Sequence, residues 1–128
     1  MQEHYIRPDG SPPANGYSHA VAFSGRLIAV SGQVPLDAEG NLVGANDPHA
    51  QATQVFGNIA TALAAAGATM ADLVMLTVYL TDLADLAAFR TARDRFVSTD
   101  KPPASSLVQV GGLVNPGFRI EIDALAAT

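Results

Sequence analysis

The chain has 128 residues, of which 48% are hydrophobic and 15% are charged, with 12 acidic residues, seven basic residues and no cysteine. This length fits one domain spanning residues 1–128, and the absence of cysteine excludes disulfides, thiolate metal sites and cysteine nucleophiles. The net charge of -5 and the scattered basic residues argue against nucleic acid as a partner, because that binding needs clustered Lys and Arg.

Composition also bears on location and association. The first residues lack the basic and apolar regions of a signal peptide, and no apolar run approaches the ~20 residues of a membrane span. We therefore expect a cytoplasmic protein with no membrane contact. The charged share lies below the usual value of about 25%, which favours an oligomer that hides part of its surface, although the many alanines also raise the hydrophobic share.

The N-terminal third predicts an arm followed by a hairpin. The first 18 residues hold three prolines and two glycines, which is typical of an extended arm with turns. Residues 19–23 and 26–31 are short strand-like runs on either side of Ser24-Gly25, a turn signal that favours a hairpin. Residues 37–41 form a second turn cluster.

The next segment carries the clearest helix signals. Asp47 is a good N-cap, Pro48 needs no backbone donor at the first helical position, and Gly67 supplies a left-handed stop. One apolar stripe at helical spacing joins these signals: it consists of Val55, Ile59, Ala62, Leu63 and Ala66.

The C-terminal half predicts a strand, a second helix and two more strands. Residues 73–80 form an almost continuous apolar run, which suggests a strand covered on both faces. Asp82 can cap a second helix that ends before the prolines at 102–103; its repeating residues are Leu86, Phe89, Arg93 and Phe96. Residues 107–110 and 118–125 then read as strands.

This order of elements predicts an α+β fold, a mixed sheet with two helices on one face. The last strand alternates apolar residues with Arg119, Glu121 and Asp123. Glu121 therefore meets solvent, a partner subunit or a cleft, where a carboxylate can hold a water and move its proton. The alternative is a solvated strand face that only keeps the protein soluble.

Other catalytic patterns are absent from the sequence. The three histidines, His4, His19 and His49, lie far apart and show no metal-ligand spacing, so we expect no metal site. No glycine-rich loop opens a helix after a strand, and no serine lies in a nucleophile-elbow context.

Several short motifs occur together in an order that resembles the Rid (reactive intermediate deaminase, YjgF-like) family. The resemblance runs from about residue 15 to residue 127 with almost no insertions. The motifs are Tyr17-Ser18, Ser31-Gly32-Gln33, Asn58-Ile59, Ala66-Gly67-Ala68, Val78-Tyr79-Leu80-Thr81-Asp82, Pro103-Ala104-Ser105-Ser106 and Ile120-Glu121-Ile122.

The resemblance implies a chorismate-mutase-like fold and a homotrimer with a small-molecule ligand in each cleft between subunits. Deaminating members of the family hydrolyse imines and enamines to a 2-oxo acid and ammonia, and they need no cofactor. The resemblance therefore implies that no cofactor is required here.

The resemblance also assigns roles to individual residues. Glu121 matches the glutamate that activates the attacking water, and Tyr17 matches a tyrosine that lines the cleft. Ser31 and Gly32 match a polar wall of the cleft. Ser105 stands where deaminating members carry the arginine that grips the substrate carboxylate. An arginine offers two charge-assisted hydrogen bonds there, whereas a serine offers one neutral hydroxyl.

Arg90 stands where the deaminating group commonly has an asparagine, so it could replace the charge that is missing at position 105. From the residues alone, Arg90 could equally pack its stem on the surface or pair with a carboxylate such as Asp94, four residues along the helix.

Two functions therefore stay open. One is an imine or enamine hydrolase that is not a standard 2-iminobutanoate deaminase, and the other is a non-catalytic ligand-binding or regulatory trimer. Ribonuclease action, ascribed to some relatives, is disfavoured by the acidic charge balance.

Overall fold

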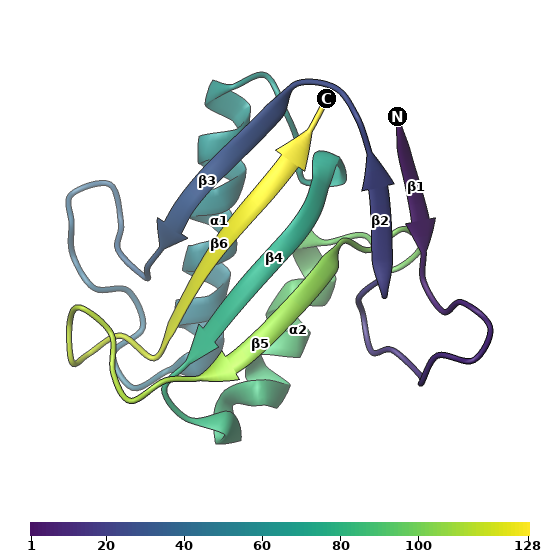
Figure 1. Cartoon of the computed structure of the whole chain (residues 1–128). Helices are drawn as coiled ribbons and strands as arrows, with labels where there is room; N and C mark the ends of the chain where they lie inside the picture. Colours follow the sequence, from purple (N-terminus) through teal and green to yellow (C-terminus); the bar gives the residue numbers. More distant parts are fainter.

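The computed structural model describes residues 1–128 and contains six strands, two α-helices and two short 3₁₀ helices (Figure 1). In chain order these are β1 (Gln2–Tyr5), β2 (Ala20–Phe23), β3 (Leu27–Gln33), α1 (Pro48–Ala65), η1 (Met70–Asp72), β4 (Leu73–Leu80), η2 (Leu83–Asp85), α2 (Leu86–Phe96), β5 (Ala104–Gln109) and β6 (Ile120–Ala127).

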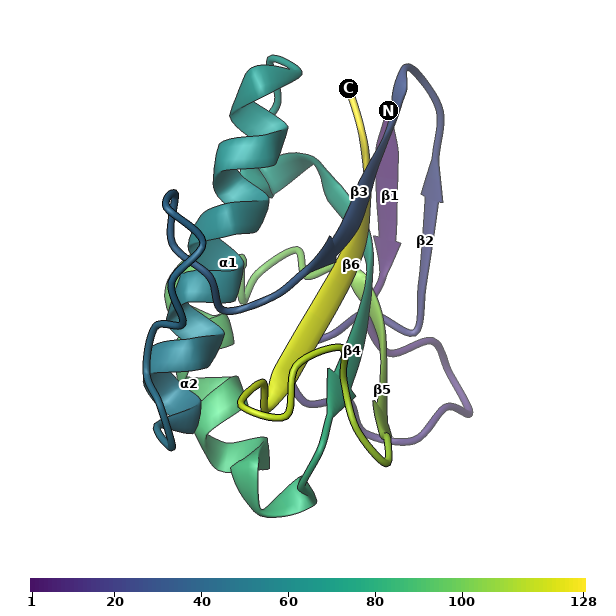
Figure 2. The same cartoon turned by 90° about the vertical axis from the view of Figure 1, so that its left-hand side faces the viewer.

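Four strands form the main sheet in the order β3-β6-β4-β5. β4 and β5 are parallel, whereas β6 runs antiparallel to both of its neighbours. Both helices pack on one face of this sheet, and no helix covers the other face, which we call the open face (Figure 2). The predicted α+β architecture, a mixed sheet with two helices on one face, is confirmed.

Helix α1 begins and ends where the sequence signals predict. The Asp47 carboxylate accepts a hydrogen bond from the Ala50 amide at 3.0 Å, and Pro48 opens the first turn. Gly67 follows the helix with a φ of +76°, a left-handed conformation that glycine adopts at little cost. The two ends are therefore decided by local chemistry.

The core lies between the two helices and the main sheet and consists of one cluster of 18 buried residues. The predicted stripe of α1 supplies part of it. Phe56, which the stripe did not include, stacks on Phe89 and Phe96 of α2, with ring centroids 6.0 and 5.6 Å apart. Such aromatic pairs add about 0.5–1.5 kcal/mol beyond their buried area, and here they hold the two helices together.

Within this chain β4 is not covered on both faces, contrary to the sequence prediction. Leu76 and Val78 are buried beneath the helices. Met75, Thr77 and Tyr79 point to the open face and are only partly buried. The run therefore contains more apolar residues than the helix-covered face of β4 can bury.

The predicted hairpin between residues 19–23 and 26–31 is wrong. β2 pairs instead with β1, which lies in the predicted arm, and β3 pairs with β6. The reason lies at the turn: Arg26 and Thr128 exchange two backbone hydrogen bonds of 3.0 Å. The C-terminal strand thus occupies the edge that β2 would need.

The start of α2 and the start of β5, two elements that carry candidate site residues, also differ from the prediction. Asp82 caps the short helix η2, accepting from the Ala84 amide at 2.9 Å, and α2 begins only at Leu86. β5 begins at Ala104 rather than Leu107, because parallel pairing with β4 starts at Met75. Ser105 and Ser106 therefore lie inside a strand, on alternate faces.

No helix of the structure combines the length and apolar composition that a bilayer span requires.

Candidate active site

Three of the predicted site residues line one cavity at the edge of the sheet. Tyr17 from the N-terminal arm, Arg90 from α2 and Ser105 from β5 border a cavity of about 270 Å³. The remaining walls are mostly apolar or already hydrogen-bonded: Asn15, Leu86, Phe89, Arg93 and Leu107. The sequence separations are large, so only the fold brings these side chains together.

Arg90 is the cationic group of this cavity that has no protein partner. It takes part in neither of the two ion pairs of the chain, and it makes no side-chain hydrogen bond. The alternative partner considered from the sequence, Asp94, binds Arg93 instead, with Nε and Oδ1 3.0 Å apart. A half-buried arginine at a cavity wall, with no anion of the chain bound to it, is available to a ligand.

Tyr17 is held near Ser105 because its neighbour, Ser18, is hydrogen-bonded to the segment that precedes Ser105. The Ser18 hydroxyl donates to the Pro102 carbonyl at 2.6 Å, and the Ser18 amide donates to the Pro103 carbonyl at 2.9 Å. Ser18 is itself buried. The Tyr-Ser motif and the proline-containing segment, 84 residues apart, therefore form one wall of the cavity.

Arg93 belongs to the same cavity, and the sequence placed it only in the repeating face of the helix. Its guanidinium donates to the Asn15 carbonyl and to the Asn15 side-chain oxygen, both at 3.0 Å. Gly16 has a φ of +70°, and a Cβ there would lie 2.2 Å from the guanidinium. Arg93 therefore ties the arm to α2. The sequence predicts turns in this arm, but it does not indicate that the arm is bound by Arg93.

The other three predicted residues gather between β3 and β6. Ser31 and Gly32 lie at a register shift of β3, between Val30 and Gln33. A Cβ on Gly32 would lie 2.3 Å from Glu121 Oε2. The Glu121 carboxylate thus lies directly against the Gly32 backbone, and it makes no hydrogen bond or ion pair within the chain. Gly32 also borders a second, larger cavity of about 590 Å³ towards α1.

Tyr79 and Asp123 share the open face with Glu121. Tyr79 pairs directly with Glu121 across the strands, and its hydroxyl donates to Asp123 Oδ2 at 3.0 Å. That hydrogen bond, together with desolvation and the two nearby carboxylates, raises the pKa of Tyr79. This part of the open face is therefore acidic, and Tyr79 stays protonated at neutral pH.

The two groups of site residues lie on opposite faces of the sheet. Glu121 pairs with Tyr79 and Tyr79 with Val108, so these three share the open face. Ser105 lies three positions from Val108 and pairs with buried Leu76, which puts it on the helix side. Glu121 also lies two strand spacings, about 10 Å, from β5. One chain therefore does not bring all six predicted residues into one site.

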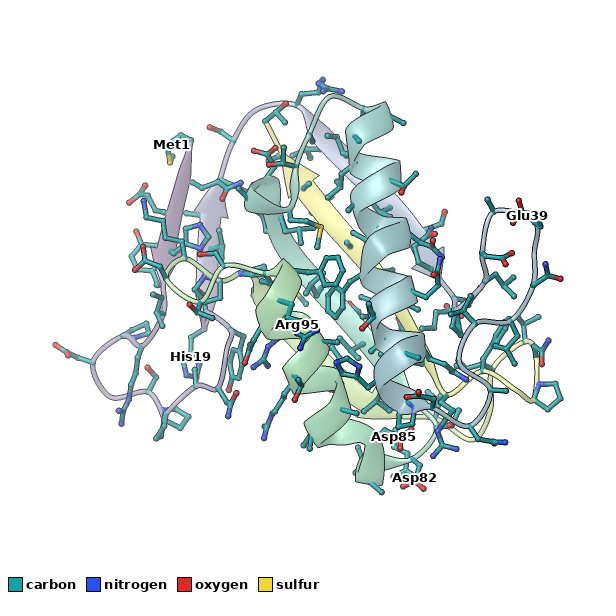
Figure 3. All side chains as sticks on the ribbon, turned by 180° about the vertical axis from the view of Figure 1, so that it is seen from behind. Met1, His19, Glu39, Asp82, Asp85 and Arg95 are labelled. Carbon is teal, nitrogen blue, oxygen red and sulfur yellow. The ribbon has the colours of Figure 1, made fainter.

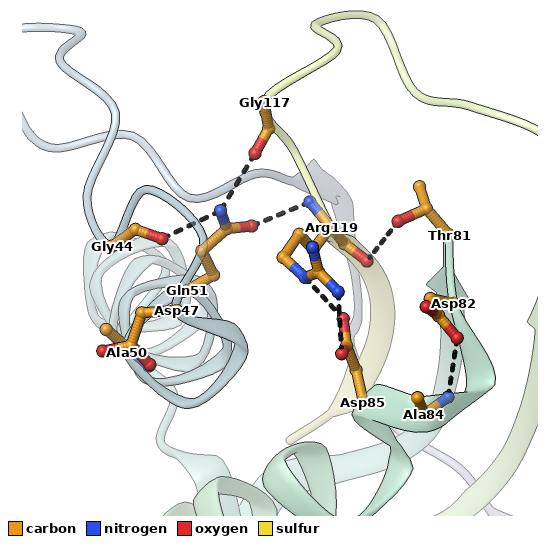
Figure 4. Close-up of polar contacts among 10 residues, drawn as sticks. All are labelled: Gly44, Asp47, Ala50, Gln51, Thr81, Asp82, Ala84, Asp85, Gly117 and Arg119. Atoms are coloured by element: carbon orange, nitrogen blue, oxygen red, sulfur yellow. Dashed lines mark hydrogen bonds and ion pairs between the residues drawn. The ribbon is translucent and has the colours of Figure 1, made fainter.

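Arg119 does not share the face of Glu121, contrary to the prediction. It precedes β6, and its guanidinium pairs with buried Asp85, Nε to Oδ2 at 2.8 Å and Nη2 to Oδ1 at 3.0 Å (Figure 4). The bond to Asp85 raises the pKa of Arg119. Its amide donates to fully buried Gln51. This network joins α1, η2 and β6, and it has a structural role.

No three histidine, aspartate or glutamate side chains come together as metal ligands. The chemistry that the predicted site residues can offer is therefore that of one unpaired carboxylate, one unpaired guanidinium and three hydroxyls, beside an apolar wall.

The fold and the site define an α+β protein with a partly polar cavity at the edge of its sheet. The family model described as Endoribonuclease L-PSP matches residues 9–128. Protein DfrA of Myxococcus xanthus is 38% identical over 130 residues, which cover 100% of this chain and 98% of that protein. A RutC family protein of Saccharolobus solfataricus is 35% identical over 126 residues, or 98% of each chain.

Solved structures agree with these relatives. A Rid-family protein of Yersinia pestis, YyfB, described as of unknown function, superposes with a TM-score of 0.90 at 38% identity, covering 99% of this chain and 98% of that one. RidA from an Antarctic Psychrobacter has a TM-score of 0.75 at 35% identity, covering 98% and 100%. The chain belongs to the Rid (YjgF-like) family.

Proposed function

We propose that this protein is a Rid-type hydrolase that adds water to the C=N bond of a small imine or enamine and releases ammonia. The observation that carries the proposal is the Glu121 carboxylate, which lies unpaired against Gly32 on an otherwise largely apolar strand. A carboxylate without a protein partner is free to hold a water molecule and accept its proton.

The proposed reaction balances as a simple hydrolysis. Glu121 takes a proton from water as the water oxygen bonds to the imine carbon, and the C=N electron pair moves to nitrogen, which is protonated. The resulting carbinolamine collapses: its hydroxyl proton passes through Glu121 to the amino nitrogen, the C=O bond forms, and the C–N bond breaks to release NH3. The products are a 2-oxo acid and ammonia, and no cofactor takes part.

Ser105 argues against the standard 2-iminobutanoate activity. Its neutral hydroxyl replaces a fork that would make two charge-assisted hydrogen bonds, and the loss amounts to roughly two orders of magnitude in carboxylate affinity. Arg90 lines the same cavity and has no other anion to bind. We therefore propose that the anionic end of the substrate is held from α2 instead of from β5.

A homotrimer with clefts between its copies would complete the site. Glu121 and the cavity lie on opposite faces of one sheet, so a second copy must supply one of the two halves. Support comes from the open face, where Leu27 and Val108 are exposed and Met75 and Leu125 are only partly buried. Such a surface favours burial against another copy.

A non-catalytic ligand-binding trimer is the second candidate, and Ser105 is the observation that favours it: a chain that has lost the family arginine could bind without turnover. Ribonuclease action, named in the family model, is the weakest candidate, because a chain with a net charge of -5 repels a phosphate backbone.

The test is the hydrolysis of a panel of imines formed in situ by an amino-acid oxidase. We expect weak or no acceleration for 2-iminobutanoate, acceleration of at least one other imine, and a loss of about 100-fold or more in Glu121→Gln. Asp123→Asn, on the same face two residues further on, is the matched control and should keep most of the activity. Stabilisation by ligands without any turnover would favour the binding trimer and contradict the hydrolase.

A further inference from the structure

The cavity beside α2 offers one free positive charge. Arg93, the second arginine of the cavity, has Nε, Nη1 and Nη2 engaged by Asp94 and Asn15. It also lies over the Phe89 ring, with its guanidinium carbon 5.7 Å from the ring centroid. The charge of Arg93 is therefore already balanced, and its guanidinium is held in one position. Arg90 alone remains to bind an anion.

The remaining wall of the cavity is apolar. Leu86 and Phe89 come from the first turn of α2, and Leu107 lies on β5 two residues after Ser105. Ser105 and Leu107 share a face of the strand, so the hydroxyl and the apolar wall are adjacent along it. A second anionic group placed here would lose its water without gaining a partner.

The size of the cavity restricts the ligand further. About 270 Å³ lies near the lower limit of the 300–1,000 Å³ that is usual for drug-sized ligands. A molecule of amino-acid size with a branched substituent fits this volume, whereas a methyl or ethyl group leaves the apolar wall uncovered.

From these observations we infer that the cavity selects a monocarboxylate with a branched apolar substituent, its anion on Arg90 and its substituent on Leu86, Phe89 and Leu107. Ser105 and Tyr17, which line the same cavity, would then contact the rest of the ligand. This inference rests on the proposed function for the reaction, but it concerns binding and is tested without turnover.

The experiment is calorimetric titration of the full chain with three 2-oxo acids, which are products of the proposed reaction. The probes are pyruvate, 4-methyl-2-oxopentanoate and 2-oxoglutarate. Each buried CH₂ strengthens binding by about fourfold. The branched acid, with three more carbons than pyruvate, should therefore bind at least about tenfold more tightly. 2-Oxoglutarate should bind no better than pyruvate.

Variants separate the charge from the apolar wall. Arg90→Ala should weaken all three acids by about tenfold or more, whereas Arg95→Ala should change nothing. Arg95 is an exposed arginine of the same helix outside the cavity and has no ion pair (Figure 3). Leu107→Ser should remove the preference for the branched acid and keep pyruvate binding. If that variant unfolds, half-buried Leu86→Ser serves the same purpose.

Equal affinity for the three acids, tighter binding of 2-oxoglutarate, or an Arg90→Ala variant that binds like the parent would overturn the inference. Absence of binding by every acid would overturn it as well. Preferential binding of the branched acid without imine turnover would support the inference and remove the hydrolase proposal. The two failures are therefore distinguishable.

Discussion

Two arginines on one helix show how position decides the role of a residue. Arg90 and Arg93 are one turn apart and line the same cavity, yet Arg93 is only 6% exposed and holds the arm through Asn15. Arg90 has no protein partner. The difference follows from which acceptors the fold places within reach, since both side chains have the same five donors.

At the same scale, Gly32 should be required for the position of Glu121. Gly32→Ala places a Cβ 2.3 Å from Glu121 Oε2, a contact that the flexible carboxylate relieves by moving. We expect thermal stability near that of the parent, and imine hydrolysis reduced by about tenfold or more, because a small misplacement of a reacting group is costly.

The control for this variant is Gly57→Ala in α1, where nothing outside the adjacent helix backbone lies within 4 Å of the new Cβ. It should raise the free energy of unfolding by roughly 0.5–1 kcal/mol, since alanine is the better helix former, and leave hydrolysis unchanged. A Gly32→Ala variant with full activity would contradict the contact between Gly32 and Glu121 as a condition of catalysis.

At the scale of elements, Gln51 joins pieces of backbone that no regular hydrogen-bond ladder connects. It is fully buried in the first turn of α1 and donates to the carbonyls of Gly44 and Gly117 at 3.0 and 2.9 Å. It accepts from the Arg119 amide at 2.8 Å. The loop before α1 and the start of β6 thus meet at one amide side chain.

Gln51→Leu should therefore lower the free energy of unfolding by roughly 3 kcal/mol or more, because each unsatisfied buried group costs about 1–3 kcal/mol. Denaturant unfolding measures the change. Gln54→Leu is the comparison: the Gln54 side chain donates to the Leu36 carbonyl oxygen, which also accepts a hydrogen bond from Asn58 Nδ2. It should cost less than about 1 kcal/mol. Equal losses in the two variants would contradict the role given to Gln51.

At the scale of the whole molecule, the open face is the side of the main sheet that no helix of the chain covers. It carries Glu121 and half-buried apolar residues, while the cavity lies on the other side of the sheet. We expect a homotrimer, and sedimentation at micromolar concentration should give about three times the chain mass of 13.2 kDa. A monomer at that concentration would rule out a site shared between copies.

Subunit mixing tests the shared site directly. Arg90→Ala and Glu121→Gln trimers should each keep only a small fraction of the parent's activity. After dissociation and reassembly of an equal mixture, about a quarter of the sites should combine two intact halves if each site joins neighbouring copies. Partial recovery of imine hydrolysis is the expected result, and no recovery in confirmed mixed trimers would place both residues in sites of single copies.

Local signals in the sequence were sufficient for the limits of α1 and for the fold class, but not for the start of α2, because Asp82 caps the short helix η2 instead. Asp47, Pro48 and Gly67 act within a few residues of themselves, so the limits of α1 could be read directly. The alternation of β6 likewise placed Glu121 away from the core. Strand pairing could not be predicted from local signals. β2 pairs with β1 and not with β3, because the distant C-terminus binds the turn between β2 and β3.

For the site, the six residues were named through the resemblance of the sequence motifs to the Rid family. The tertiary structure decided how they are grouped: Tyr17, Arg90 and Ser105 at one cavity, and Ser31, Gly32 and Glu121 on the opposite face. It also showed Arg93 in the cavity and left Arg90 unpaired. These results depend on sheet register and on the arrival of the N-terminal arm at α2, and both are set by contacts between residues more than 70 positions apart. No local pattern encodes such contacts, because their energy arises only when the whole chain has folded.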